Sequence, residues 1–224
     1  MSELAERPGF RDGASVAFVY FDLGNVLATF DPSRGCRNVA QRWGCDADQV
    51  RRVVWDSGLQ DRFEHGAIDP RQFTDIVRRE LHLDPREVDS GELLDRLCDM
   101  FEPIDEMVEI VDSVRAAGIK LGILSNTCLA HWGWLQTRRY AALQGPFDSL
   151  ILSYEHGVMK PAADIYQVAT RAALGAVPTA TAESILFFDD RLENVDAALA
   201  HRWQAHRFTD ANAAREVLRW WGIG

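Results

Sequence analysis

The sequence predicts an α/β fold, a Rossmann-like, doubly wound parallel sheet with a small helical cap inserted after the first strand. Short, continuous apolar runs recur along the chain, and such runs are typical of strands covered on both faces. Amphipathic patterns of helical length separate them, which indicates parallel strands joined by right-handed crossovers. One long region, residues 32–101, interrupts this alternation with helical patterns alone.

The apolar runs predict five strands, of which the last is the weakest. They lie at residues 16–21, 120–124, 150–152, 184–188 and 204–208. Helical patterns follow them at residues 104–117, 161–174, 194–200 and 211–221. Gly118 is expected to end the first of these helices and Pro161 to begin the second, because glycine favours helix C-termini and proline favours the first helical turn.

The interrupting region predicts a separate helical unit. Its helical pieces lie at residues 36–43, 47–56, 70–81 and 91–100, separated by glycine and Asp-Pro pairs. We therefore expect a core made of residues 16–31 and 102–224, a cap of residues 32–101, and a mobile N-terminal tail of residues 1–15. An insert after the first strand lies over the carboxyl ends of a parallel sheet, where it can act as a lid.

Composition narrows the classes of function. The chain has 224 residues, 47% of them hydrophobic, and a net charge of −10, which argues against a nucleic-acid partner. Four cysteines without C-x-x-C spacing predict free thiols in a reducing cytoplasm. No run approaches the roughly 20 apolar residues of a membrane span. The expected partner is a small molecule, and the oligomeric state stays open.

Polar side chains occur where the predicted strands end. The first strand ends on Asp22, the second runs into Ser125 and Asn126, Lys160 follows the third, and the fourth ends on Asp189 and Asp190. The carboxyl ends of parallel strands converge on one crevice. A carboxylate is costly to bury there without a chemical role, although capping of the next turn is the alternative for each residue.

This set of side chains predicts a metal site and, beside it, a binding site for a phosphate group. Three carboxylates with a single ammonium repel one another unless a divalent cation lies among them, and Mg²⁺ prefers such hard oxygen ligands. A cation, Lys160 and the Ser125 hydroxyl would in turn bind a phosphate group.

The same residues lie in four segments that resemble the motifs of the haloacid dehalogenase superfamily of hydrolases. The segments read FDLGNVL, ILSNT, GVMKPAADIY and FFDDRLENV, in that order, and span nearly the whole chain after the tail. The helical insert stands where this superfamily has its cap. The FDLGNVL form is most similar to a branch that contains bacterial sugar-phosphate phosphatases and the phosphatase domain of epoxide hydrolases.

The resemblance implies roles for the reacting residues. Asp22 would attack phosphorus and form an aspartyl-phosphate. Ser125 and Asn126 would bind the transferring phosphoryl group, and Lys160 would neutralise the nucleophile and the phosphate.

The resemblance also implies a magnesium site. Asp22 and Asp190 would bind Mg²⁺ directly, Gly24 would contribute its backbone carbonyl, and Asp189 would be a direct or water-mediated ligand. Asn194 would order the loop that follows.

Gly24 departs from the pattern of many phosphatases in this superfamily, which have a second aspartate there as general acid. A general acid commonly contributes about 10²- to 10⁴-fold in rate. Either the substrate has a good leaving group, or another residue substitutes, or turnover is slow or lost. The candidate substitutes are Glu64, His65 and His131.

The leading interpretation is a Mg²⁺-dependent phosphatase acting on a small phosphorylated metabolite, with a sugar phosphate favoured. One alternative is a 2-haloacid dehalogenase, in which the same aspartate attacks carbon and halide leaves without a proton. Dehalogenases of this kind lack a metal, and the paired Asp189 and Asp190 favour phosphate. The other alternative, supported only by Gly24, is a catalytically weak binding or regulatory protein.

Overall fold

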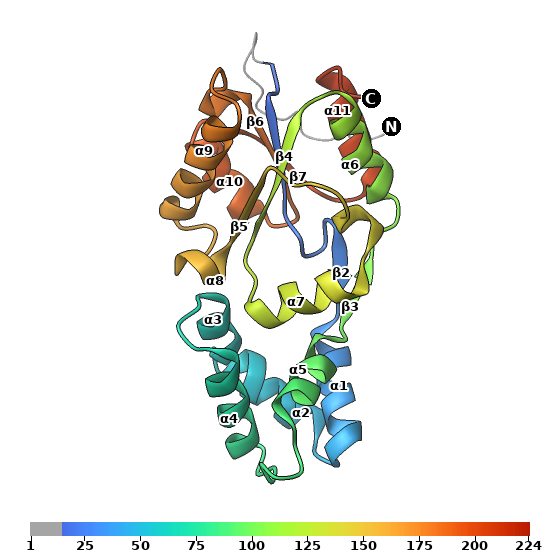
Figure 1. Ribbon diagram of the computed structural model, residues 1–224, viewed down its shortest axis with the longest axis vertical. Coiled ribbons are helices and arrows are strands. Elements are labelled where there is room, and N and C mark those ends of the chain that lie inside the picture. Colours follow the sequence, from blue (N-terminus) through green and yellow to red (C-terminus); the bar gives the residue numbers. More distant parts are fainter. Residues whose placement is uncertain (1–14) are drawn as a thin grey trace, which may run out of the picture.

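A five-stranded parallel sheet forms the centre of the protein in a computed structural model that describes residues 15–224 (Figure 1). The tail expected at residues 1–15 lies outside the described residues except for Ser15. The strand order is β5-β4-β1-β6-β7. The strands are β1 (Phe18–Phe21), β4 (Lys120–Ser125), β5 (Ser149–Leu152), β6 (Ile185–Asp189) and β7 (Gln204–Arg207). The predicted fold class is confirmed, with all five strands within two residues of their expected bounds.

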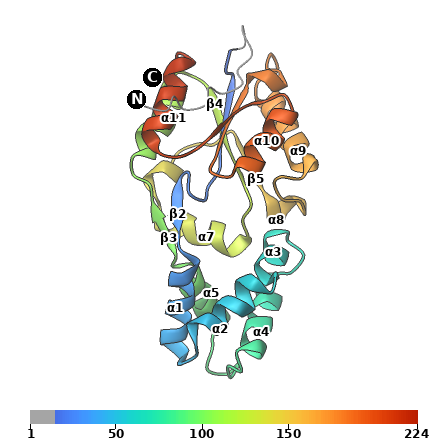
Figure 2. The same ribbon diagram turned by 180° about the vertical axis from the view of Figure 1, so that it is seen from behind.

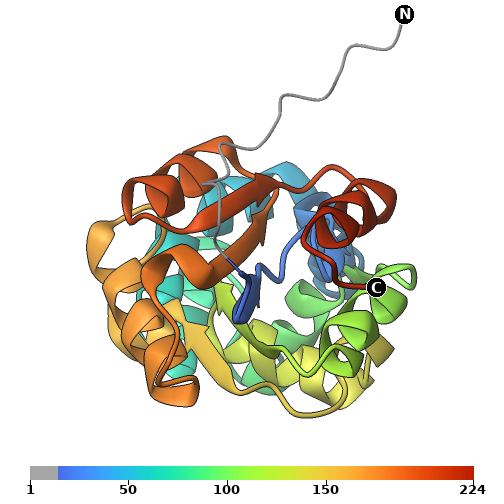
Figure 3. The same cartoon turned by 90° about the horizontal axis from the view of Figure 1, so that it is seen from above.

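Helices cover both faces of this sheet because successive side chains of each buried strand point to opposite faces. Val19 and Phe21 of β1 pack in one cluster with α6 (Met107–Ala116) and α11 (Ala211–Trp220). Phe18 and Tyr20 pack in the other with α9 (Ala163–Ala176) and α10 (Leu192–Ala200). The view from above shows the two helix layers on either side of the strands (Figure 3).

Both bounds of helix α9 differ from the sequence prediction of residues 161–174. Helix α9 begins at Ala163 and not at Pro161, because residues 159–162 form a turn in which the Ala162 N–H donates to the Met159 carbonyl at 2.9 Å. It also continues through Gly175 to Ala176. A glycine in a helix costs only about 1 kcal/mol, which the packing of the helix can offset.

Five α-helices and one π-helical turn form a second unit beyond the carboxyl edge of the sheet (Figures 1 and 2). They are α1 (Pro32–Trp43), α2 (Ala47–Arg51), η1 (Arg52–Asp56), α3 (Leu59–Glu64), α4 (Pro70–Glu80) and α5 (Ser90–Cys98). Asp31 and Asp69 cap α1 and α4 by accepting backbone N–H bonds, each followed by proline in the first turn. The unit has its own apolar cluster, which includes Phe63, Phe73 and Leu93.

A short antiparallel pair connects the two units. It consists of β2 (Ala28–Phe30) and β3 (Phe101–Pro103), paired with Thr29 opposite Glu102. The sequence did not predict this pair, because three-residue strands are too short to show alternation. The chain therefore leaves the core and returns to it through adjacent strands.

Further short elements complete the chain. Helix α7 (Leu129–Arg138), which the sequence did not predict, follows β4 and lies below the sheet edge (Figure 1). The others are α8 (Ser153–His156), η2 (Ala141–Leu143) and η3 (Ala182–Ser184). None of the helices within residues 15–224 combines the length and apolar character needed to cross a membrane.

Candidate active site

A cavity of about 300 Å³ lies between the carboxyl edge of the sheet and the helical unit. Its floor contains Asp22, Ser125, Asn126, Lys160 and Asp190. The register of the strands explains the convergence, because Phe21 at the end of β1 pairs with Ile123 of β4 and Phe188 of β6. Five of the predicted polar residues therefore reach one space, as expected where the carboxyl ends of parallel strands converge.

Lys160 occupies the centre of the charge arrangement. Its side chain is 1% exposed, and its Nζ lies 2.9 Å from Asp22 Oδ1 and 2.6 Å from Asp189 Oδ2. The same Nζ donates to the Leu124 carbonyl at 2.9 Å. Burial alone would lower the pKa of Lys160, but the two carboxylates outweigh it and raise the pKa above its usual value. The ammonium is therefore charged at neutral pH.

Asn126 holds the backbone of Lys160. Its Nδ2 donates to the Lys160 carbonyl at 2.9 Å, and its Oδ1 accepts from the Lys160 N–H at 2.8 Å. The Asn126 side chain is thus engaged with the protein itself. Ser125 is different, because its hydroxyl has only a 3.5 Å contact with the Asn126 carbonyl and lines the cavity. A contact of that length is weak, which leaves this hydroxyl available to a ligand.

Asp189 and Asp190 have different surroundings although they are adjacent. Asp189 is fully buried and, besides Lys160, accepts from Asn194 Nδ2 at 2.9 and 3.0 Å and from the Arg191 N–H at 2.9 Å. It does not line the cavity, whereas Asp190 does. Asp190 Oδ2 accepts one bond from Asn25 Nδ2 at 3.0 Å.

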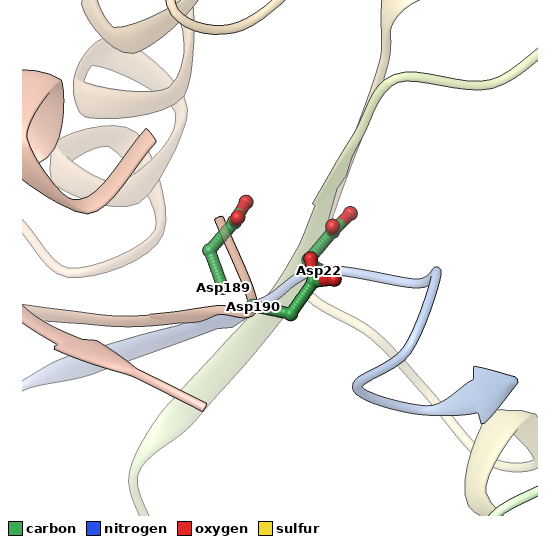
Figure 4. Close-up of side chains that lie close together, drawn as sticks. All are labelled: Asp22, Asp189 and Asp190. Carbon is green, nitrogen blue, oxygen red and sulfur yellow. The ribbon is translucent and has the colours of Figure 1, made fainter. Parts of the chain in front are cut away.

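The three aspartates form a cluster able to bind a cation. One oxygen from each of Asp22, Asp189 and Asp190 lies within 4.8 Å of the others, and the carboxylates converge from the ends of β1 and β6 (Figure 4). These hard oxygen donors fit a divalent cation such as Mg²⁺. The single ammonium of Lys160 cannot neutralise three carboxylates, so the cluster retains negative charge that a cation would balance.

Asp22 is the carboxylate best placed to react. Burial raises its pKa to about 6, and Lys160 limits the rise. The side chain is therefore mainly ionised at neutral pH. Its Oδ1 contacts Lys160 and accepts from the Leu23 N–H at 2.7 Å, so the carboxylate has a fixed orientation at the cavity floor.

A side chain at position 24 would crowd the Phe30 ring beside Asp22. A Cβ at position 24 would lie 3.0 Å from Phe30 Cε1 and 3.3 Å from Phe30 Cδ1. The Phe30 ring therefore fills the space where a side chain at this position would begin. The ring also stands 6.1 Å from that of Phe101, centroid to centroid, which makes this side of the cavity aromatic.

The cavity lining also contains two of the three candidate substitutes for the missing acid. Glu64 of α3 and His131 of α7 both line the cavity. Burial raises the pKa of Glu64 to about 7 and lowers the pKa of His131 to about 4. His65 does not line the cavity, is exposed, and its Nδ1 lies 2.9 Å from the Asp61 carbonyl of its own helix.

Several residues at the site were not found from the sequence. They are Asn25, Phe30, Trp55, Gln60 and Ser153. Ser153 directly follows β5, so the strand-end rule that found the other residues could have found it. Asn25 lies within the FDLGNVL segment, so its closeness to Asp22 could also have been found. The other three carry no spacing signal, because only the tertiary fold brings them to the cavity.

Known proteins resemble this chain over most of its length. A protein of Mycobacterium tuberculosis named phosphatase MT3486 is 28% identical over 207 residues, 90% of this chain and 91% of that protein. Sesquiterpene phosphatase astK of Aspergillus oryzae is 25% identical over 199 residues, 89% of this chain and 93% of that protein. Among solved structures, the magnesium complex of a HAD family enzyme from Bacteroides thetaiotaomicron superimposes with a TM-score of 0.74 at 21% identity, covering 92% of this chain and 99% of that one.

The family model for haloacid dehalogenase-like hydrolases matches residues 19–202. That segment includes every residue that lines the cavity, from Asp22 to Asn194. The sequence match and the parallel sheet with its acidic cluster agree, and the protein belongs to the haloacid dehalogenase-like hydrolases, a family of enzymes.

Proposed function

We propose that the protein is a Mg²⁺-dependent phosphatase that acts on a small phosphorylated metabolite of the cytoplasm through an aspartyl-phosphate on Asp22. The observation that carries this proposal is the ionised Asp22 carboxylate, held by Lys160 at the floor of a cavity beside two more aspartates. Relatives named as phosphatases, in a bacterium and in a fungus, support it.

The proposed reaction has two halves. A carboxylate oxygen of Asp22 bonds to phosphorus while the bond from phosphorus to the leaving oxygen breaks. A water oxygen then bonds to the same phosphorus, the bond from phosphorus to Asp22 breaks, and phosphate leaves with Asp22 regenerated. Lys160 keeps Asp22 ionised and offsets the negative charge of the phosphoryl oxygens.

The other residues position these groups. The Ser125 hydroxyl donates to a phosphoryl oxygen, and Asn126 acts through the backbone of Lys160 and not by direct contact with phosphate. Mg²⁺ would be held by Asp22, Asp190 and the Gly24 carbonyl, where it would supply positive charge against the phosphoryl group. We place Asp189 behind these ligands, since its oxygens already have partners in Lys160, Asn194 and the Arg191 N–H.

The cavity restricts the class of substrate. Its volume of about 300 Å³ suits a small metabolite, and residues 32–101 would act as the cap that covers it. Sugar phosphates remain the favoured substrates. The aromatic side chains of Phe30, Trp55 and Phe101 also line the cavity, so phosphates of apolar alcohols belong in the same test.

A dehalogenase is the second candidate and is less well supported. A 2-haloacid carries a carboxylate, which the cluster of Asp22, Asp189 and Asp190 would repel in the absence of a cation. The same three carboxylates would repel a phosphate ester. However, they also fit a divalent cation, and a bound cation would cancel this repulsion.

The test is phosphate release from a panel of sugar phosphates, terpenyl phosphates, nucleotides and acyl phosphates. We expect release that needs Mg²⁺, stops with EDTA and is lost in Asp22→Asn. Asp75→Asn, an exposed change on α4, is the matched control and retains activity. Release that survives full chelation would overturn the proposal, as would full activity in Asp22→Asn. Chloride release from 2-chloropropionate without phosphatase activity would favour the dehalogenase.

A further inference from the structure

Among the described residues that form the floor of the cavity, none is placed to donate a proton to a leaving oxygen. Leu23 and Gly24 beside the nucleophile have no acidic side chain, and the Lys160 ammonium is engaged with two carboxylates and a carbonyl. An alkoxide leaves phosphorus slowly unless it is protonated as the bond breaks. If the proposed phosphatase activity holds, the proton must come from a residue that lines the cavity above this floor.

We propose that Glu64, supplied by α3 of the helical unit, is the general acid that protonates the leaving oxygen and the general base that then activates water. Glu64 is the last residue of α3 and lines the same cavity as Asp22. Its side chain is 15% exposed, so the carboxyl is largely shielded from bulk water.

The hydrogen bonds of Glu64 leave one oxygen free. Gln60 Nε2 donates to Glu64 Oε1 at 2.9 Å, and His131 Nδ1 lies 4.0 Å from the same oxygen. Within residues 15–224, Glu64 Oε2 has no hydrogen-bond partner. Gln60 is 3% exposed and thus fixes the carboxyl from one side. A proton on Oε2 is therefore available to a substrate.

A contact with the core fixes the backbone of Glu64. The Ser153 hydroxyl, fully buried at the end of β5, lies 2.6 Å from the Glu64 carbonyl and accepts from the Thr127 N–H at 2.9 Å. Ser153 thus links Glu64 to the segment that contains Ser125 and Asn126. Glu64 belongs to the helical unit, yet this hydrogen bond connects it directly to the floor of the site.

The next residues confirm how closely α3 approaches the core. Gly66 has a φ of +67°, and a Cβ there would lie 2.2 Å from the Tyr154 carbonyl oxygen. Only glycine allows this approach, and the backbone of α8 fills the space. Glu64 therefore has a defined position relative to the ends of β4 and β5.

The surroundings of Glu64 keep a substantial fraction of its carboxyl protonated near neutral pH. Burial raises its pKa to about 7, and the negative charges of Asp61 and Asp22 act in the same direction. The Gln60 hydrogen bond and the charge of Arg191 oppose the rise. His131 faces the carboxyl from α7 but is uncharged at this pH, because burial lowers its pKa to about 4.

The competing groups in the cavity are less suitable. Asp61 lies one turn earlier on α3 and also lines the cavity, but it is exposed to solvent. His131 has lost its proton at neutral pH. Asp190 belongs to the carboxylate cluster, where a proton would weaken cation binding.

Glu64 gives up one proton and regains one proton in each turnover. The Glu64 proton moves to the leaving oxygen as its bond to phosphorus breaks and Asp22 bonds to phosphorus. The alcohol leaves, and Glu64 is now a carboxylate. It takes a proton from the water that attacks the aspartyl-phosphate, which restores the acid as phosphate and free Asp22 form.

The test compares Glu64→Gln with the matched control Asp61→Asn on two substrates, glycerol 2-phosphate and p-nitrophenyl phosphate. In Glu64→Gln, we expect turnover of the alkyl ester to fall about 10²- to 10⁴-fold. With the aryl ester, whose leaving group needs no proton, a burst of about one nitrophenol per active site should precede slow turnover, because the base for the second half is lost. Asp61→Asn should lose less than tenfold on either substrate and show no new burst.

Two results would overturn the role of Glu64. One is equal loss on both esters without a burst, and the other is full activity of Glu64→Gln on the alkyl ester. Glu64→Ala gives a second measure, since added formate should restore part of its activity and fail to restore that of Asp22→Asn. Wild-type protein without any Asp22-dependent phosphate release would instead refute the proposed phosphatase function.

Discussion

Replacing Lys160 with methionine tests the charge arrangement on which the site depends. The substitution keeps most of the side-chain volume and removes the ammonium. Two carboxylates then lose their partner, namely Asp189, which is fully buried, and Asp22, which is 7% exposed. Because the side chain of Lys160 is itself 1% exposed, water cannot replace the lost contacts.

The expected loss of stability in Lys160→Met follows from the contacts of the ammonium. The Nζ lies 2.9 Å from Asp22 Oδ1, 2.6 Å from Asp189 Oδ2 and 2.9 Å from the Leu124 carbonyl. Removal of one partner from a buried ion pair costs about 3–5 kcal/mol. A protein of this size has a free energy of unfolding of about 5–15 kcal/mol. Lys160→Met should therefore still fold, but with a free energy of unfolding about 3–5 kcal/mol lower.

Urea denaturation in EDTA, followed by circular dichroism, measures the loss. The control is Lys120→Met at the chain's other lysine, whose ion pair with Asp148 has the same kind of contact at 2.7 Å but is 49% exposed on the lysine side. An exposed pair contributes about 0–1 kcal/mol. Adding Asp189→Asn to Lys160→Met should recover part of the stability, because one unpaired buried charge is removed.

The loss of stability in Lys160→Met should also depend on pH. Burial raises the pKa of Asp22 to about 6 even with Lys160 present, and without Lys160 it rises further. A carboxyl whose pKa is raised on folding destabilises the protein as pH rises through that range. The deficit should therefore be smaller at pH 5 than at pH 8. A deficit below 1 kcal/mol at pH 8, or no coupling with Asp189→Asn, would refute the reasoning.

Three further predictions concern the cluster, the aromatic wall and the proton donor. Asp190→Asn should lower Mg²⁺ affinity at least tenfold by calorimetry with little change in stability, whereas Asp189→Asn should lower stability as well; equal stabilities would contradict the different surroundings of the two residues. Gly24→Asp should lower the free energy of unfolding by about 1 kcal/mol in urea denaturation. Its Cβ would lie 3.0 Å from Phe30 Cε1, and this ring, 37% exposed, has to shift. Phe30→Ala should reduce that cost. For an alkyl phosphate, kcat/KM should fall as pH rises above about 7, where Glu64 loses its proton, and this fall should be absent in Glu64→Gln.

The sheet could be predicted from the sequence because buried parallel strands are continuous apolar runs. Residues 184–188, for example, correspond to β6 at Ile185–Asp189. The floor of the site followed from the same runs, since each strand end fixes where its next polar residue lies. Asp22 and Asp190 were therefore found without any knowledge of side-chain contacts.

The walls of the site could not be predicted in this way. Phe30 reaches Gly24 only because β2 pairs with β3, across some 70 residues of chain. The sequence offered Glu64, His65 and His131 as candidate acids and could not decide among them. Their burial separates them, because Glu64 gains a higher pKa, His131 a lower one, and His65 stays outside the cavity.

The central claim is that Asp22 attacks phosphorus, and acid quenching during a single turnover of a ³²P-labelled phosphate ester tests it most directly. With enzyme in excess, the label should appear on the protein before it appears as free phosphate, because the phosphoryl group passes through Asp22. Digestion should locate the label in the peptide that contains Asp22. If phosphate is released while no label reaches that peptide at any time, water attacks the substrate directly and the central claim is contradicted.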